Sequence, residues 1–198
     1  GDVQVRGPQL TAPFVGWLAR HKAAVGRLQL VDVRTSPLAV LAALDGGAIA
    51  ALEVKIYLYD VVRFQPADAL PLVARLGNSL TELVLDGIRL QRLPSELSAL
   101  SALKALAIVS SERIGMGGDA AISPLTTVSQ LTSLQLGVCG LRHLPQQLAA
   151  LGFLRRLDLN GNRLAAADAH IFQGLQLLTG LTSLGLRNCH LALLPPQL

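Results

Sequence analysis

The stretch LRRLDLNGNRL, from Leu154 to Leu164, decides how this chain folds. Leucines occupy its first, fourth, sixth and eleventh positions, and Asn162 occupies the ninth. Alternate side chains of a short extended segment point to the same side, so Leu157 and Leu159 face inward while Asp158 faces solvent. The stretch therefore predicts a short strand with one buried side, followed by a turn whose asparagine side chain points inward and hydrogen-bonds the backbone.

The first half of this pattern, L-x-x-L-x-L, recurs along the chain. It begins at Val25, Ile49, Leu80, Leu103, Leu131, Leu154 and Leu181. Successive starts are separated by 24, 31, 23, 28, 23 and 27 residues, so short and long units alternate. One unit cannot bury its own apolar edge, and neighbouring units must therefore stack. We predict parallel strands at 25–31, 49–55, 80–86, 103–109, 131–137, 154–160 and 181–187.

The complete pattern resembles the leucine-rich repeat family, whose form is L-x-x-L-x-L-x-x-N/C-x-L, from Val25 to Leu198. Three units carry the family's residue at the ninth position: Cys139, Asn162 and Cys189. The other units carry different residues there: Val33, Tyr57, Ile88 and Ser111. The expected fold is an α/β leucine-rich-repeat solenoid, a horseshoe with a parallel β-sheet on its concave side and helices outside.

The outer segments are predicted to differ between short and long units. Short units carry LPSEL from Leu93, LPQQL from Leu144 and LPPQL from Leu194. Their prolines (Pro94, Pro145 and Pro195) remove backbone donors that a helix needs. We expect α-helices in the long units, alternating with shorter or 3-10 segments in the short ones.

The residues before the first repeat predict a helix. In FVGWLARHKAAV, one helical face carries Phe14, Trp17, Leu18, His21 and Val25. Thr11 is the expected N-cap, and Pro13 falls in the first turn. We therefore expect residues 1–24 to form an N-terminal helical segment that covers the open end of the stack. Residues 25–198 would be seven leucine-rich repeats, the last of them truncated.

Residues 14–30 are similar to the entry into the repeats of plant and green-algal F-box leucine-rich-repeat proteins. This resemblance implies the substrate-recruiting region of an F-box-type ubiquitin ligase receptor. The LPxxLxxL units also resemble the repeats of intracellular plant-type immune receptors, which implies a sensing region as an alternative. Flanking sequence would separate the two, because one has an F-box upstream and the other a nucleotide-binding domain.

A glycine-rich stretch, RIGMGGDAAI from Arg113 to Ile122, offers a different class of function. Its residues 115–120 match G-x-G-x-x-A, the spacing of dinucleotide-binding loops, and leave a nucleotide-binding enzyme as a remote alternative. Residues 138–141, about twenty positions on, contain no acidic residue to hold a ribose. Aligned with the other long unit, residues 115–117 fall on the alanines 165–167. We therefore expect a loop that needs backbone freedom.

Composition argues against several further classes of function. The net charge is +4 with no run of Lys or Arg, so no nucleic-acid partner is expected. No apolar run approaches the ~20 residues of a membrane span. Cys139 and Cys189 are too few and too far apart for a disulfide framework or a zinc site, and no N-x-S/T acceptor occurs. We expect a monomeric fragment of a larger chain, inside the cell in the cytoplasm or nucleus.

No catalytic, cofactor-binding or metal-binding residue is expected, because the four histidines lack partners at ligand spacing. Function is therefore assigned to a protein partner that binds the solvent-facing strand positions, which are the third, fifth and seventh of each repeat and include Val31, Ala51 and Gly137. The predicted contact residues are Glu53, Lys55, Glu82, Asp86, Gln135, Arg156, Asp158, Asn160 and Arg187. The middle unit presents only Ala105, Ala107 and Val109, and an apolar centre with a polar surround is how a protein-binding patch is organised. The sequence thus predicts a non-catalytic protein-protein interaction module.

Overall fold

The computed structural model describes residues 1–6, 11–31, 43, 49–55, 74, 76–88, 90–164 and 175–191. The chain divides into two compact units. The N-terminal unit comprises Gly1–Ile88 and Pro94–Leu103, and the C-terminal unit comprises Arg89–Leu93 and Lys104–Leu198. Each unit is built around four parallel strands, and the two are described separately.

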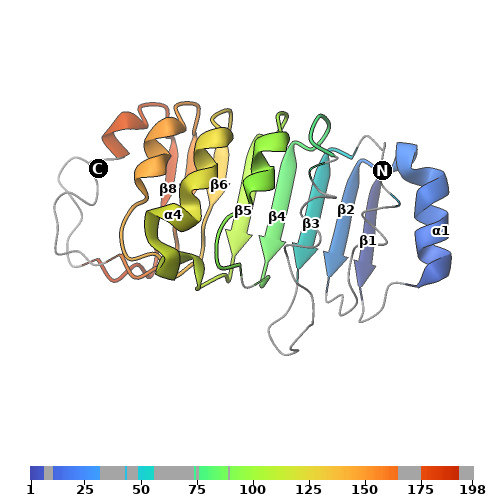
Figure 1. The fold of residues 1–198 in the computed structure, drawn as a ribbon, viewed down its shortest axis with the longest axis horizontal. Coiled ribbons are helices and arrows are strands. Elements are labelled where there is room, and N and C mark those ends of the chain that lie inside the picture. Colours follow the sequence, from blue (N-terminus) through green and yellow to red (C-terminus); the bar gives the residue numbers. More distant parts are fainter. Residues whose placement is uncertain are drawn as a thin grey trace. The chain divides into compact units, whose positions relative to one another are not determined.

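The N-terminal unit contains β1 (Asp2–Arg6), β2 (Arg27–Val31), β3 (Ala51–Lys55) and β4 (Glu82–Asp86), which lie side by side in chain order (Figure 1). All three pairings are parallel. The register places Leu28 opposite Leu52, and Leu52 opposite Leu83. These fourth-position leucines are fully buried, and each such side chain contributes roughly 1.5–3 kcal/mol of burial free energy.

The C-terminal unit repeats this arrangement with β5 (Ala105–Val109), β6 (Ser133–Gln135), β7 (Arg156–Asp158) and β8 (Ser183–Gly185). The strands are again parallel, and Leu106, Leu134 and Leu157 lie opposite one another in successive strands. Each of these leucines is at most 2% exposed. The seven predicted ranges each contain an observed parallel strand, so the α/β leucine-rich-repeat fold is confirmed.

The first 24 residues differ from the expectation of a helix alone. The helix is present as α1 (Ala12–His21), with Thr11 extended at its N-cap position but without a side-chain cap bond. Ahead of it lies β1, which pairs with β2, so β1 rather than α1 forms that edge of the sheet. DVQVR in β1 has the same alternation as RLQLV in β2, which gives β1 one side to bury. The division of the chain at residue 24 stays a prediction.

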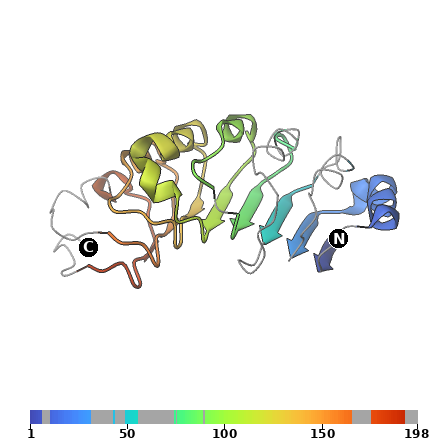
Figure 2. The ribbon, with the colours of Figure 1, turned by 60° about the horizontal axis from the view of Figure 1, so that its bottom comes forward.

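The outer segments follow the predicted alternation where the structure describes them. The short repeats form 3-10 helices, η2 (Ser95–Ala99) and η5 (Gln146–Ala150), each with its proline at the N-cap position. The long unit between β5 and β6 forms η3 (Ile114–Gly117), α4 (Gly118–Ile122) and η4 (Ser123–Thr127). Figure 2 shows α4 on one side of the C-terminal unit's strands. Pro195 and residues 165–174 lie outside the described residues.

The ninth positions of the C-terminal unit carry a buried ladder of polar side chains. The Cys139 thiol donates a hydrogen bond to the Ile108 carbonyl at 3.3 Å, and the Cys189 thiol donates to the Leu159 carbonyl at 3.2 Å. Each acceptor is the sixth residue of the preceding repeat, so the bonds link one repeat to the next. Ser111 occupies the same position and is fully buried, but its hydroxyl has no hydrogen-bond partner.

Asn162 is the most heavily bonded member of this ladder. Its side-chain amide donates to the Leu136 and Leu159 carbonyls, both at 2.7 Å. Its Oδ1 accepts hydrogen bonds from the backbone N–H groups of Cys139 and Leu141, both at 3.0 Å. One fully buried side chain therefore satisfies four backbone groups, which explains why the turn after the strand favours an amide here.

Candidate protein-binding surface

The solvent side of the N-terminal unit carries an ion pair that spans a strand. Arg27 on β2 and Glu82 on β4 form two hydrogen bonds, at 2.7 and 3.3 Å. Between them on β3 lies Ala51, whose register partners are these two residues and which is 6% exposed. A predicted contact residue, Glu82, is thus engaged within the chain. The sequence contained a sign of this ion pair, because residues of opposite charge occupy the third position in two repeats with one repeat between them.

The other predicted contact residues of this unit are Glu53, Lys55 and Asp86. In the backbone register Lys55 lies opposite Asp86, at the ends of β3 and β4. The side chains of Glu53 and Lys55 lie outside the described part of the structure, and Asp86 is half-buried. Val31 was expected to face solvent at the seventh position, but it is only 6% exposed. That expectation is wrong for Val31, and Ala51 at a third position is likewise buried.

The C-terminal unit gathers its polar residues on β7, β8 and the turns that follow them. The Asp158 carboxylate accepts a hydrogen bond from the Asn160 backbone N–H at 2.8 Å. The Asn160 side-chain oxygen in turn accepts one from the Arg187 backbone N–H at 2.6 Å. Gly185 gives these side chains room, because a Cβ there would lie 3.0 Å from Asp158 Oδ1. Three predicted contact residues thereby form one connected cluster.

Two arginines extend beside this cluster. Arg156 and Arg187 are both exposed, and neither forms an ion pair with any residue that the structure describes. Gln135 lies opposite Asp158 in the β6–β7 register and is half-buried. The five predicted contact residues of this unit therefore lie on adjacent strands or on the turns directly after them.

Small side chains lie next to these polar groups on β5 and β6. Ala105, Ala107 and Ser133 are partly exposed, and Gly137 is buried where the template placed a solvent-facing residue. Ala105 pairs with Ser133 in the register. The solvent side of the C-terminal unit therefore combines a shallow, small-residue area with a polar, arginine-bearing one.

The two cysteines are unpaired and buried. Burial raises the pKa of Cys139 to about 12, against a smaller lowering by the Ser111 backbone N–H. Burial also raises the pKa of Cys189. The repeat that contains Asn162 lies between the repeats of the two cysteines. The cysteines are therefore two strand spacings apart, at about 4.8 Å for each spacing, which is too far for a disulfide. Both thiols therefore occupy structural positions in the ladder.

Two glycines of the stretch RIGMGGDAAI are required for different reasons. A Cβ on Gly115 would lie 1.9 Å from the Gly140 carbonyl oxygen, so this position requires glycine for close packing of two backbones. Backbone freedom, the expected cause, applies instead to Gly118, whose φ is +58°. The alanines 165–167, with which the stretch was aligned, lie outside the described residues.

Histidines and acidic groups form no recognisable metal centre in the described ranges. No group of three or more His, Cys, Asp or Glu side chains there could hold a metal ion. His21 Nδ1 lies 2.8 Å from the Trp17 carbonyl oxygen, and the two rings stack. His143 Nδ1 lies 4.0 Å from Asp119 Oδ1. Within the described residues, no helix is both long and apolar enough to cross a bilayer.

Comparison with solved structures gives the same fold. A leucine-rich repeat protein of Leptospira interrogans aligns over 98% of this chain and 44% of its own, with a TM-score of 0.64 and 20% identity. The functional domain of InlJ from Listeria monocytogenes, which includes a cysteine ladder, aligns over 94% and 34%, with a TM-score of 0.53 and 18% identity.

The Toll–Spatzle complex of Drosophila aligns over 84% of this chain and 27% of its own, with a TM-score of 0.51 and 15% identity. The chain thus spans less than half the length of each of these structures. No protein-family model and no curated protein matches the sequence. The chain therefore has the leucine-rich-repeat fold.

Proposed function

We propose that this chain is a non-catalytic protein-interaction module that binds a protein through the solvent side of β5 to β8. The observation that carries the proposal is the pair of exposed arginines, Arg156 and Arg187, beside the small-residue area of β5 and β6. Neither arginine forms an ion pair with a described residue, so both are available to a partner. One protein of the same fold, Toll, is known in complex with Spatzle.

Physical chemistry favours such a surface for protein recognition. Arginine is enriched at interface centres because its planar group makes directed hydrogen bonds and also packs on apolar surface. Small residues on the neighbouring strands let a partner's larger side chains approach the sheet. The hydrogen bond that the Arg187 backbone N–H donates to the Asn160 side-chain oxygen fixes part of this surface before binding, which limits the ordering cost.

The test is a charge reversal on the sheet with a matched reversal elsewhere. Arg156→Glu with Arg187→Glu is compared with Arg155→Glu and Arg163→Glu, which change two exposed arginines outside the proposed contact set. Partners recovered from lysate are purified and titrated against each variant. We expect about tenfold or greater loss of affinity for the sheet variant only. A partner that binds both variants equally well contradicts this binding surface.

The finer assignment follows the resemblances of the sequence. We propose the substrate-recruiting region of an F-box-type ubiquitin ligase receptor, on the similarity of residues 14–30, with the sensing region of an intracellular immune receptor as the alternative. Both assignments place the protein inside the cell, in the cytoplasm or nucleus. The complete transcript tests both, since an F-box upstream supports the first and a nucleotide-binding domain the second.

A further inference from the structure

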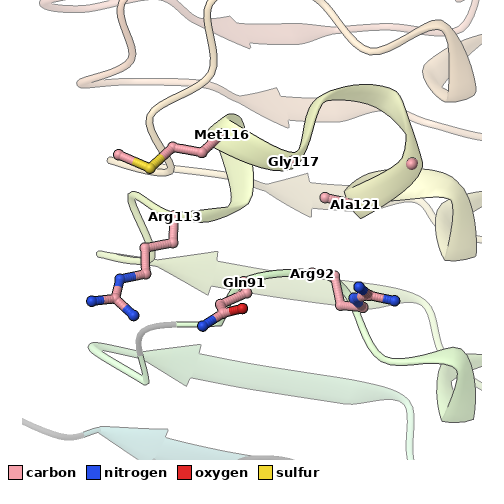
Figure 3. Close-up of a pocket in the computed structure, with 7 residues that line it drawn as sticks. Gln91, Arg92, Arg113, Met116, Gly117 and Ala121 are labelled. Carbon is pink, nitrogen blue, oxygen red and sulfur yellow. The ribbon is translucent and has the colours of Figure 1, made fainter.

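A pocket of about 330 Å³ lies within the C-terminal unit, away from the residues assigned to the sheet surface. It is lined by Gln91, Arg92, Arg113, Met116, Gly117, Ala120 and Ala121. The segment after β4 forms one wall, and the glycine stretch with α4 forms the other (Figure 3). The pocket thus includes part of the stretch RIGMGGDAAI, whose glycine spacing left a nucleotide-binding enzyme as a remote alternative.

Backbone hydrogen bonds hold both walls. The Leu93 N–H donates to the Ala121 carbonyl at 2.7 Å and fixes the Gln91–Arg92 segment against α4. The Gly115 N–H donates to the Cys139 carbonyl at 2.9 Å, which ties the glycine stretch to the next repeat. A Cβ on Gly117 would lie 2.6 Å from the Ala121 Cβ, so glycine is needed at this wall. The pocket is therefore formed before any ligand arrives.

The charge of the pocket is positive. Arg92 and Arg113 are both exposed, and they extend to opposite sides of Gln91 (Figure 3). Among the residues that the structure describes, no acidic group pairs with either arginine, although Glu112 is the chain neighbour of Arg113. No lining residue is acidic. The lining thus carries two positively charged guanidinium groups, which extend to opposite sides of one neutral amide.

An apolar contact lies beside these charges. Met116 is 82% exposed, the highest exposure among the large apolar side chains of the residues that the structure describes. Its flexible thioether side chain adapts to varied apolar partners. The exposed Ala120 adds a small apolar wall. A ligand that suits this site therefore carries both an anionic group and an apolar side chain.

We propose that this pocket binds an acidic segment of a partner protein, in which carboxylates alternate with apolar side chains. The carboxylates pair with Arg92 and Arg113, and an apolar side chain packs on Met116. Because the two arginines extend to opposite sides of Gln91, the site suits an extended chain that offers more than one carboxylate. This site is separate from the sheet surface, so the proposal stands whether or not that surface binds a partner.

The test uses a fluorescein-labelled peptide of alternating glutamate and leucine, with a matched peptide of alternating glutamine and leucine. Anisotropy titrations compare the unmodified chain with Arg92→Gln/Arg113→Gln and with the control Arg155→Gln/Arg163→Gln. The control removes the same charge from exposed positions that do not line the pocket. We expect the glutamate peptide to bind the unmodified chain and the control alike, and the pocket variant about tenfold more weakly.

A second variant blocks the pocket and keeps its arginines. Ala120→Glu places a carboxylate on the exposed wall, and Ala150→Glu does the same on η5. Only the first is expected to weaken the peptide, and raising the salt concentration should weaken binding as well.

Equal binding of the glutamine peptide, equal loss in the control variants, or no binding at a peptide concentration of about 1 mM overturns the proposal. Displacement of the peptide by ATP, at lower ATP than peptide concentration, overturns it in favour of a phosphate site. Circular dichroism of each variant confirms that a loss of binding is not a loss of fold.

Discussion

Arg27 and Glu82 join the first and third of three adjacent strands by a two-point ion pair that passes over Ala51. The nearest atoms, Arg27 Nη2 and Glu82 Oε2, are 2.7 Å apart. The small side chain of Ala51 on β3 leaves room for the two longer side chains to meet across it. The pair therefore fixes the relative position of β2 and β4 through contacts that no single repeat contains.

We predict a modest coupling between these two residues. Their side chains are 41% and 33% exposed, so solvent screens the pair and limits its contribution to about 0.5–1 kcal/mol. A double-mutant cycle with Arg27→Ala and Glu82→Ala, followed by urea denaturation, measures this coupling. The coupling should shrink in about 1 M salt. A value that is zero at low salt would show that the pair does not hold these strands.

Asn162 and Ser111 occupy equivalent positions but should respond oppositely to alanine. Asn162→Ala leaves two backbone N–H groups and two carbonyls buried without partners, and we expect a loss of roughly 3 kcal/mol or more. Ser111→Ala removes a hydroxyl that already lacks a partner, so stability should stay the same or rise slightly. The urea concentrations at the unfolding midpoints of the two variants, compared with that of the unmodified chain, test this prediction. Equal losses at both positions would contradict a ladder built on side-chain hydrogen bonds.

Gly115→Ala should destabilise the fold through a backbone collision. The new Cβ would meet the Gly140 carbonyl oxygen at 1.9 Å, and rigid backbone cannot yield cheaply. We expect a loss of about 3 kcal/mol, above the 1 kcal/mol that backbone freedom alone would give.

Gly152→Ala is the matched control for this substitution, because nothing lies within 4 Å of its Cβ position and its φ is not positive. It should leave the melting temperature unchanged or raise it slightly. Similar melting temperatures for the two variants would refute the close approach of Gly115 to the next repeat.

Alkaline pH should destabilise the protein through Cys139. Burial raises the pKa of this thiol to about 12 in the folded chain, from 9.0. The stability that this difference represents is fully present below pH 9 and is lost as the pH rises from 9 to 12. The loss has an upper limit of about 1.4 kcal/mol per pH unit. The difference in unfolding free energy between the unmodified chain and Cys139→Ala, measured across this range, isolates the thiol from the other groups that titrate there.

The repeats illustrate how far a sequence determines this fold. The strand positions, their parallel order and the alternation of outer segments all followed from leucine spacing and from Pro94 and Pro145. They could be predicted because each depends on residues within one unit or on the same position of the next. The inward-facing Cys139, Asn162 and Cys189 could be predicted for the same reason.

Tertiary structure decided the features that depend on contacts between different repeats. The edge strand β1 was missed because DVQVR is a single short alternation without the leucines of the template. The pairing of Arg27 with Glu82 depends on the register of β2, β3 and β4 and on the small size of Ala51. The role of Gly115 is invisible in sequence because its reason, the carbonyl of Gly140, lies 25 residues away along the chain. The pocket beside Arg92 and Arg113 also depends on segments that are distant in the sequence. A backbone hydrogen bond from the Leu93 N–H to the Ala121 carbonyl holds these two segments together.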